Sequence, residues 1–357
     1  RSWDRTLSSK TAWPPTSRVM IRGAAAIKAL RNPWLYGAAK PVQEKAEKKP
    51  VDFVSLRKKF LTISACLMAA ILLCAVVFGV HLDTEFTGGA MITLSYEGSF
   101  DQAAVQKTAA AALENTGLTL QTGENVATGD QTLKISMPGT ETVTTEQVEN
   151  LLDSLNENYP DNQFTQLSLS NVSAAMGTKF LQKSLVAVVF ALVLILLYIA
   201  LRFKNIGGLT GGMMAVLALV NDLMVVLGTF VLLRTPLDGN FIAAMLTILG
   251  YSINDTVVVY DRIRENRALM GKKASFEELV NRSVNQSARR TLITTITTVM
   301  ALGVLCIVAK LYGLDSIFTF AFPLMMGMIS GVYTSLCVST SAWMLWSERS
   351  PKSGKKA

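Results

Sequence analysis

Two aspartates and one arginine lie inside or directly beside long apolar stretches of this chain. Asp222 lies in LALVNDLMVVLG, Asp255 lies in LTILGYSINDTVVVY, and Arg290 directly precedes the apolar run that begins at Thr291. An ionisable group inside a bilayer costs about 2.5–3.5 kcal/mol on insertion scales, so such a residue is a functional candidate by default. Burial and a nearby guanidinium act in opposite directions on the proton affinity of a carboxyl group. Asp255, Arg290 and Asp222 therefore predict a proton relay in which the carboxylates load and release a proton as an arginine approaches or retreats.

Polar residues next to Asp255 in the sequence complete this candidate site. Asn254, Ser252 and Tyr251 are predicted to support the relay with hydrogen bonds. We interpret four further residues as a solvated helix end: Asp261, Arg262, Arg264 and Glu265. The sequence has no cluster of His and Cys with metal-ligand spacing, so we expect no metal site, no cofactor and no catalytic residue.

Long apolar runs decide the class of protein. Half of the residues are hydrophobic, only 17% are charged and the mean hydropathy is +0.35, whereas a soluble domain has about 25% charged residues. About 20 mostly apolar residues cross a bilayer as a helix. The runs predict an α-helical polytopic membrane protein with six transmembrane helices at about 60–80, 184–201, 206–233, 241–260, 291–309 and 317–346.

The distribution of charge predicts the orientation in the membrane. Residues 1–59 form a basic tail with a net charge of +10, and the segment 82–178 has a net charge of −11. The loop 261–290 and the tail 347–357 are basic. Basic residues next to spans stay in the cytoplasm, so we expect both termini in the cytoplasm and the segment 81–180 outside it. Because the positive charge is split among membrane flanks, it does not indicate nucleic-acid binding.

The external segment 81–180 has the pattern of a small soluble domain. Stretches of alternating polarity predict strands, and the longer stretches between them predict helices. Thr144 or Thr145 is expected to cap the second helix, and Gly129-Asp130 predicts a hairpin turn. The resulting order, β-α-β-β-α-β, is typical of a ferredoxin-like α+β domain between the first and second spans. The predicted strands are 91–96, 118–126, 131–137 and 164–169, and the predicted helices are 101–115 and 144–158.

Glycines spaced four residues apart indicate places where helices cross closely. We predict that three such pairs pack helices against one another: Gly207 and Gly211, Gly208 and Gly212, and Gly327 and Gly331.

Three blocks of the sequence form distinctive motifs. The first is FTGG directly after Glu85, consisting of Phe86, Thr87, Gly88 and Gly89. The others are GYSINDTVVVYDRIREN at 250–266 and NRSVNQSARRTLITT at 281–295. Together these blocks resemble the SecF family of protein-export membrane subunits. The resemblance covers about 53–346, and Glu85 stands where the family usually has Asp, which keeps the charge but moves it by one methylene.

The resemblance implies a fold, a function and partners. The six spans would form half of a bundle of the RND superfamily, and a SecD-like subunit would supply the other half. The pair would use the proton motive force to promote late translocation and release of preproteins across the bacterial cytoplasmic (inner) membrane. Expected partners are therefore a SecD-like subunit, the SecYEG translocon, the unfolded preprotein and the lipid bilayer, with H+ or Na+ as the coupling ion.

The same resemblance assigns roles to individual residues. Asp255 corresponds to the aspartate of the family's Asn-Asp pair, and Arg290 corresponds to the arginine before the fifth span. Asp222 corresponds to the aspartate of a His-Asp pair, of which the histidine is Asn221 here. Asp255 and Arg290 are one residue further apart in this sequence than the corresponding pair in the family's pattern, so Arg289 remains an alternative partner.

Two alternative functions and one question about the N-terminal residues stay open at this point. An RND-like lipid or drug transporter subunit would share the bundle, but the acidic external segment disfavours an apolar portal. An intramembrane aspartyl protease would use Asp222 and Asp255 as a dyad, but neither lies in a GxG pattern. The chain begins at Arg1 and has Met20 inside its tail, so residues 1–50 are either native or evidence of a fragment.

Overall fold

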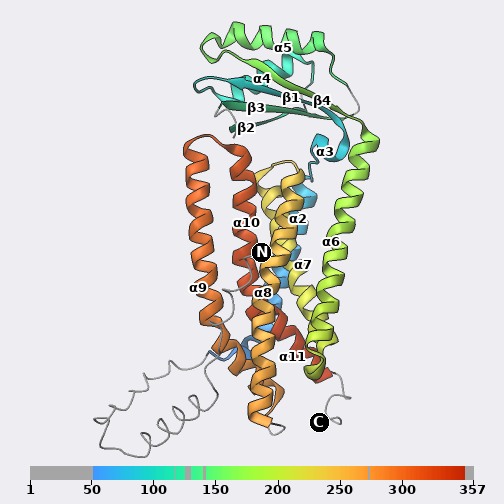
Figure 1. The fold of residues 1–357 in the computed structure, drawn as a ribbon, viewed down its shortest axis with the longest axis vertical. Helices are drawn as coiled ribbons and strands as arrows, with labels where there is room; N and C mark the ends of the chain where they lie inside the picture. The colour runs from blue at the N-terminus through green and yellow to red at the C-terminus, as the bar shows by residue number, and fades with distance from the viewer. Residues whose placement is uncertain (1–50, 116, 125–129, 140–141, 272–273, 350–357) are drawn as a thin grey trace, which may run out of the picture. The chain divides into compact units, whose positions relative to one another are not determined.

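The computed structural model of the protein describes residues 51–115, 117–124, 130–139, 142–271 and 274–349. Six of its helices are long and apolar enough to cross a membrane, which confirms the number predicted from the apolar runs. The first five are α2 (Phe53–Phe78), α6 (Ala174–Arg202), α7 (Gly208–Leu233), α8 (Gly239–Met270) and α9 (Phe276–Leu311). The sixth span runs from Asp315 to Glu348. Figure 1 shows these helices as an elongated bundle with a small sheet at one end, called here the sheet end.

The sixth span consists of three consecutive helical pieces. α10 (Asp315–Tyr333) leads into a single π-helical stretch, Thr334–Val338, and then into α11 (Ser339–Arg349). Such a π-helical turn inside a helix is rare and frequently marks a functional site.

The helices extend beyond the apolar runs, and this corrects several predicted boundaries. The basic loop predicted at 261–290 is helical over most of its length, because α8 continues to Met270 and α9 begins at Phe276. α6 begins at Ala174, inside the external domain predicted to reach residue 180, and α2 begins at Phe53, inside the tail predicted to reach residue 59. The apolar criterion fails here because it detects only the apolar part of a helix, and the polar turns beyond that part carry no such signal.

Polar caps set these helix ends. The carboxylate of Asp52 accepts hydrogen bonds from the first turn of α2, and the hydroxyl of Ser173 accepts one from Met176 at the start of α6. Ser275 does the same for α9 through the amide of Glu278. A side chain of this kind satisfies one of the amides that a helix start leaves without a partner. The predicted tails lie largely in 1–50 and 350–357, outside the described residues.

A four-stranded antiparallel sheet follows the first span. Its strands are β1 (Gly89–Tyr96), β2 (Thr119–Glu124), β3 (Gln131–Pro138) and β4 (Thr165–Val172), and their spatial order is β2-β3-β1-β4. With α4 (Gln102–Ala112) and α5 (Thr145–Asn158), the elements follow one another in the predicted order β-α-β-β-α-β. β2 and β3 pair as a hairpin, as expected, but Gly129 of the predicted turn lies outside the described residues.

One apolar core holds the sheet and its helices together. Ile92 of β1 lies opposite Ile135 of β3, and both side chains are fully buried. Leu151 and Leu155, one turn apart on α5, belong to the same cluster. A capping box at Thr144 and Gln147 fixes the start of α5, which selects Thr144 from the two predicted caps. Because this core is separate from that of the bundle, the sheet is a distinct packing unit.

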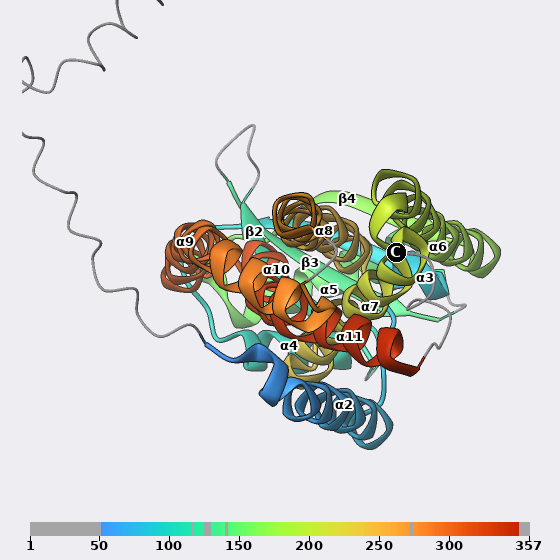
Figure 2. The same cartoon turned by 90° about the horizontal axis from the view of Figure 1, so that it is seen from below.

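A short helix, α3 (Thr84–Thr87), connects the first span to the sheet, and glycines let it approach α6 closely. A Cβ atom at Gly88 would lie 2.5 Å from the backbone nitrogen of Ala174, and Gly88 has a φ of +80°. At Gly177 of α6, a Cβ atom would lie 2.7 Å from the nitrogen of Gly88. The two glycines of this contact therefore have no room for a side chain, and Figure 2 shows α3 beside α6 in the view along the helices.

Candidate functional site: two carboxylates in the membrane bundle

Asp222 lies at the centre of the packed bundle and is fully buried. Its Oδ2 accepts a hydrogen bond from Ser252 Oγ of α8 at 2.7 Å, and its Oδ1 accepts one from Ser330 Oγ of α10 at 2.7 Å. Thr334 Oγ1 lies 2.8 Å from Oδ1 and 2.9 Å from Oδ2. Three hydroxyl groups from two neighbouring helices thus surround both oxygens of this carboxylate.

Two of these donors, Ser330 and Thr334, were not predicted from the sequence. Ser330 and Thr334 are four residues apart, so they lie on one face of the last span, and Thr334 is the first residue of the π-helical turn. A pair of hydroxyl residues at helical spacing within an apolar run is the signal that would have found them. The neighbouring Asn221 has a structural contact of its own, because its Oδ1 accepts a hydrogen bond from Ser64 Oγ of α2 at 2.7 Å.

Asp255 is also buried, at 5% exposure, but its surroundings differ. Its Oδ2 atom is inaccessible and has no hydrogen-bond partner. Among the described residues, no cation lies within ion-pair distance of this carboxylate, so Arg290 of α9 could act on it only by longer-range electrostatics. A buried carboxylate oxygen without a donor is costly, so this site is suited to gain and lose a partner.

Arg290 is an exposed residue that borders a cavity of about 320 Å³ at the junction of α6, α8 and α9. Val257 and Val258, on the turn of α8 that follows Asp255, line the same cavity, and so does Asp261. Arg289 is exposed and is not among the lining residues. The geometry therefore favours Arg290 over Arg289 as the charge that acts on Asp255.

The predicted supporting residues separate into three environments. Ser252 contacts Asp222 and not Asp255. The hydroxyl of Tyr251 lies 3.3 Å from Thr295 Oγ1 and 3.4 Å from Thr298 Oγ1, so it connects α8 to α9. Asn254 is exposed and lines a second cavity with Tyr198 and other residues of α6 and α8. The structure thus brings only Ser252 to a carboxylate of the predicted relay.

The charged residues at the far end of α8 form ion pairs on the surface. Asp261 Oδ1 lies 2.5 Å from Arg264 Nη2 and 3.5 Å from Arg202 Nη2. Arg262 Nη1 lies 2.7 Å from Glu265 Oε2. These partly exposed pairs fit the interpretation as a solvated helix end.

The arrangement does not resemble a proteolytic dyad. A dyad requires two carboxyl groups that share one proton, but among the described residues the hydrogen bonds to Asp222 come from hydroxyl groups, and Asp255 Oδ2 accepts none. In the part of the chain that the structure describes, no group of three His, Cys, Asp or Glu side chains could hold a metal ion.

The predicted FTGG motif builds the junction between bundle and sheet. Phe86 is buried and stacks on Phe180 of α6 at a centroid distance of 5.6 Å. Glu85 Oε2 accepts a hydrogen bond from the backbone amide of Gly239, the first residue of α8, at 2.7 Å. Glutamate reaches one methylene further than aspartate, and this reach is used in the bond to Gly239. A Cβ atom at Gly89 would lie 2.0 Å from the carbonyl oxygen of Met137, which explains the second glycine.

The predicted packing glycines lie at close approaches in the bundle. A Cβ atom at Gly208 would lie 2.5 Å from the carbonyl oxygen of Ala200, and one at Gly327 would lie 2.8 Å from Ile248 Cδ1. A Cβ atom at Gly331 would lie 3.2 Å from Ser252 Oγ, beside Asp222. A Cβ atom at Gly211 would likewise lie close to Trp343, and one at Gly212 would lie close to Leu196. Gly207 instead has a φ of +93° and precedes α7.

Comparison with known proteins shows the family of this chain. Residues 151–349 match the family described as "Protein export membrane protein SecD/SecF, C-terminal". The chain belongs to this family. Its relatives include the protein translocase subunit SecF of Petrotoga mobilis, which is 32% identical over 298 residues, covering 81% of this chain and 94% of that protein. The six candidate spans, the matching family and these relatives together show that the chain is a multi-pass membrane protein of the protein-export family.

In other relatives the matching region is part of a longer chain. The protein translocase subunit SecDF of Bacillus subtilis is 29% identical over 301 residues, which cover 84% of this chain and 39% of that protein. The crystal structure of SecDF, a translocon-associated membrane protein from Thermus thermophilus, aligns with a TM-score of 0.70 at 28% identity. It is matched over 84% of this chain and 39% of its own chain, so the present chain spans about two fifths of the fused relatives. These relatives are named for protein translocation, and none of them supports the lipid or drug transporter alternative.

Proposed function

We propose that this export-family subunit acts with a SecD-like partner to use the proton motive force in late translocation and release of preproteins. The observation that carries the proposal is the environment of Asp255, which is a buried carboxylate with one oxygen that has no hydrogen-bond partner. A proton that crosses the membrane releases about 2.3 kcal/mol per 100 mV, and a carboxylate that changes partners is the simplest group to carry it.

Arg290 is the residue that makes the proton exchange reversible. When its guanidinium is near Asp255 it stabilises the charged carboxylate, and when it withdraws the protonated form is favoured. The cavity beside Arg290 provides room for such a movement, and it continues along α8 towards the solvated residues near Asp261. Asp222 has a supporting role in this proposal, because three hydroxyl groups hold it between α7, α8 and the last span.

The SecD-like partner is expected to pack against the face of α8 that lies between α6 and α9. Asn254 is exposed on that face, and the cavities lined by Tyr198 and Arg290 open onto it. A polar residue in a spanning helix normally faces a partner or a water-filled cavity rather than lipid. The fused relatives, of which this chain spans 39%, support a second half supplied by another chain.

The remaining parts of the proposal follow from topology and charge. The strand order β2-β3-β1-β4 with two helices supports a ferredoxin-like domain, and the scarcity of Lys and Arg in the segment that contains it supports a position outside the cytoplasm. Both termini would then lie in the cytoplasm of a bacterium, in its inner membrane. The SecYEG translocon and the emerging preprotein are the proposed partners on which the domain acts, and the bundle would form half of an RND-type assembly.

The proposal is tested in proteoliposomes that contain this chain, a SecD-like partner and the translocon. We expect an imposed proton gradient to raise the protease-protected fraction of a preprotein in the wild type. Asp255→Asn keeps the size of the side chain but cannot take up a proton, so the stimulated part should be lost. A Na+ gradient in place of the proton gradient identifies the coupling ion.

Glu277→Gln is the control, because its carboxylate belongs to a partly exposed ion pair with Arg57 and does not line the cavity beside Arg290. It should keep the stimulation that Asp255→Asn loses. Full gradient-stimulated export by Asp255→Asn, with the partner still bound, would exclude a role of this residue as the proton carrier.

A further inference from the structure

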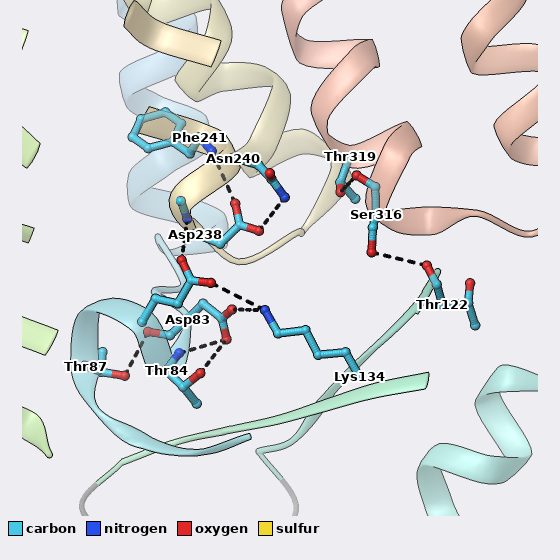
Figure 3. Close-up of polar contacts among 12 residues, drawn as sticks. Asp83, Thr84, Thr87, Thr122, Lys134, Asp238, Asn240, Phe241, Ser316 and Thr319 are labelled. Atoms are coloured by element: carbon cyan, nitrogen blue, oxygen red, sulfur yellow. Dashed lines mark hydrogen bonds and ion pairs between the residues drawn. The ribbon is translucent and has the colours of Figure 1, made fainter. Parts of the chain in front are cut away.

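Four charged residues meet at the sheet end of the bundle, where the sheet contacts the connection between α7 and α8. They are Asp83 and Glu85 of the connection into α3, Lys134 of β3, and Asp238 just before α8. Figure 3 shows the Lys134 side chain extending from the sheet towards Asp83. Two of the three acidic groups, Asp83 and Glu85, lie within ion-pair distance of the one ammonium group.

Lys134 is the only one of the four that belongs to the sheet. Its Nζ lies 3.5 Å from Asp83 Oδ2 and 3.6 Å from Glu85 Oε1. The Asp83 side chain is 1% exposed and that of Lys134 is 22% exposed, so water screens this pair much less than it screens a surface pair. A buried carboxylate that loses its cation is left with an uncompensated charge, which is strongly unfavourable.

The acidic side of this contact is continuous with the start of α8. Glu85 presents one carboxylate oxygen to Lys134 and the other to the amide of Gly239. The backbone at Asp83 is also joined to the connection between α7 and α8, since Asp83 N donates a hydrogen bond to the carbonyl oxygen of Leu237 at 2.9 Å. Asp238 Oδ1 accepts a hydrogen bond from the amide of Phe241 in the first turn of α8. A shift of Lys134 would therefore act directly on the first turn of this helix.

The sheet has a second polar contact with the bundle, and it is of a different kind. Thr122 Oγ1 of β2 donates a hydrogen bond to the carbonyl oxygen of Gly313, between α9 and α10, and lies 3.1 Å from Asp315 Oδ2. Ser316 Oγ lies 3.3 Å from the carbonyl oxygen of Thr122. These bonds involve no basic residue of the sheet. The ion pairs of the sheet with the bundle side described here are therefore those of Lys134.

We propose that Lys134 is a positioning residue that fixes the external sheet on the first turn of α8 by way of Glu85. α8 carries both Ser252, which binds Asp222, and Asp255. The Lys134–Glu85–Gly239 contact therefore links the position of the sheet to the helix on which the membrane carboxylate lies. This docking role stands whether or not Asp255 carries protons, and it is tested without an export assay.

The test measures the distance between the sheet domain and the bundle in the full chain in proteoliposomes. In a background in which the four cysteines are replaced, spin labels are placed at the exposed residues Glu146 of α5 and Tyr312 after α9. We expect one narrow distance distribution for the wild type and a broader or shifted one for Lys134→Met. Lys134→Arg should restore the narrow distribution, because a guanidinium can replace the ammonium group between two carboxylates.

A matched control and a second measurement separate docking from misfolding. Lys107→Met removes the other lysine of the acidic segment 82–178, an exposed residue on α4, and should leave the distribution unchanged. Glu85→Asp withdraws the acceptor from Gly239, so hydrogen exchange of that amide should accelerate about tenfold, as expected for loss of one charge-assisted hydrogen bond. Near-native helix content in each variant would show that the fold is retained.

A double variant tests whether Lys134 acts through Glu85. If it does, Lys134→Met combined with Glu85→Gln should broaden the distribution no more than Lys134→Met alone. The proposal is overturned if Lys134→Met leaves the distribution as narrow as in the wild type, or if Lys134→Met and Lys107→Met have equal effects. Fully additive effects of the Lys134 and Glu85 changes would equally overturn the path through Glu85.

Discussion

Two aspartates buried in the same bundle have opposite hydrogen-bonding environments. Asp222 accepts hydrogen bonds from three hydroxyl groups, and both of its oxygens have partners. Asp255 is nearly as buried, but its Oδ2 has no partner, and its nearby opposite charge belongs to an exposed arginine at the edge of a cavity. Burial alone therefore does not separate a carboxylate whose oxygens all have partners from one with an oxygen that has none.

The difference shows what each site can do. A buried carboxylate with all its acceptor sites used resists change, because any movement breaks several hydrogen bonds at once. Under the proposed function, a carboxylate with an unused oxygen and a withdrawn cation would alternate between two arrangements, which is the requirement for a switch. Asp222 thus joins α7, α8 and the last span, and Asp255 is the carboxylate that we propose exchanges partners.

The largest expected effect separates the two adjacent arginines. Arg290→Gln removes the charge that acts on Asp255, so gradient-stimulated export should fall about tenfold or more, equivalent to about 1.4 kcal/mol. Arg289→Gln, at an exposed position that does not line the cavity, should retain most of the stimulation. The measurement is the protease-protected preprotein fraction with and without an imposed proton gradient. Equal losses in the two variants would remove the assignment of Arg290 as the specific partner.

A stability measurement sharpens the structural side of the comparison. Thr334→Val has nearly the same volume but removes the hydroxyl that contacts both oxygens of Asp222. It should lower the free energy of unfolding by about 1–2 kcal/mol, given the strength of bonds to carboxylates and of hydrogen bonds between membrane helices. The readout is the thermal midpoint in detergent.

Thr247→Val is the control for that measurement. Thr247 is exposed on α8, and its hydroxyl donates only to the carbonyl oxygen of Ala243 within the same helix. Its midpoint should match that of the wild type. If Thr334→Val is equally stable, the hydroxyl cluster is not what holds Asp222 in place.

The smallest effect concerns a third buried carboxylate, outside the spans. Burial raises the pKa of Asp238, and the charges of Glu85 and Asp83 raise it further, while the amide of Phe241 and the charge of Lys134 oppose this. The folded protein then binds a proton that the unfolded chain releases near its ordinary pKa of about 3.9. Stability contributed by this group is therefore present at low pH and is lost as the pH rises from about 4 through the raised pKa.

Asp238→Asn should flatten this dependence. Asparagine keeps an acceptor for the amide of Phe241 but carries no charge, so the thermal midpoint of the variant should fall less than that of the wild type as pH rises through this window. The expected difference is smaller than about 1 kcal/mol, or roughly 2–4 °C for a domain of about this size. Parallel pH profiles for the two proteins would contradict the raised pKa.

The apolar runs were sufficient to predict six spans, because lipid requires about 20 apolar residues in each. They could not give the helix ends, since the polar turns of α8 and α9 beyond the membrane have no apolar signal and depend on caps such as Ser275. Asp222 and Asp255 were found because charges are rare in such runs. Ser330 and Thr334 were missed because the contact that makes them important joins helices far apart in the sequence.

The sequence by itself determined the class of this protein, its number of spans, the element order of its sheet and the identity of its two membrane carboxylates, because periodicity and isolated charge are local properties. The tertiary structure decided which carboxylate is satisfied and which is not, since that depends on the approach of α8 and α10 to Asp222 at residues such as Gly331. It also decided that Lys134, one of two lysines in an acidic segment, lies between Asp83 and Glu85. Hydrogen bonds and ion pairs between distant segments are consequences of packing, and packing is not encoded in any single stretch of the chain.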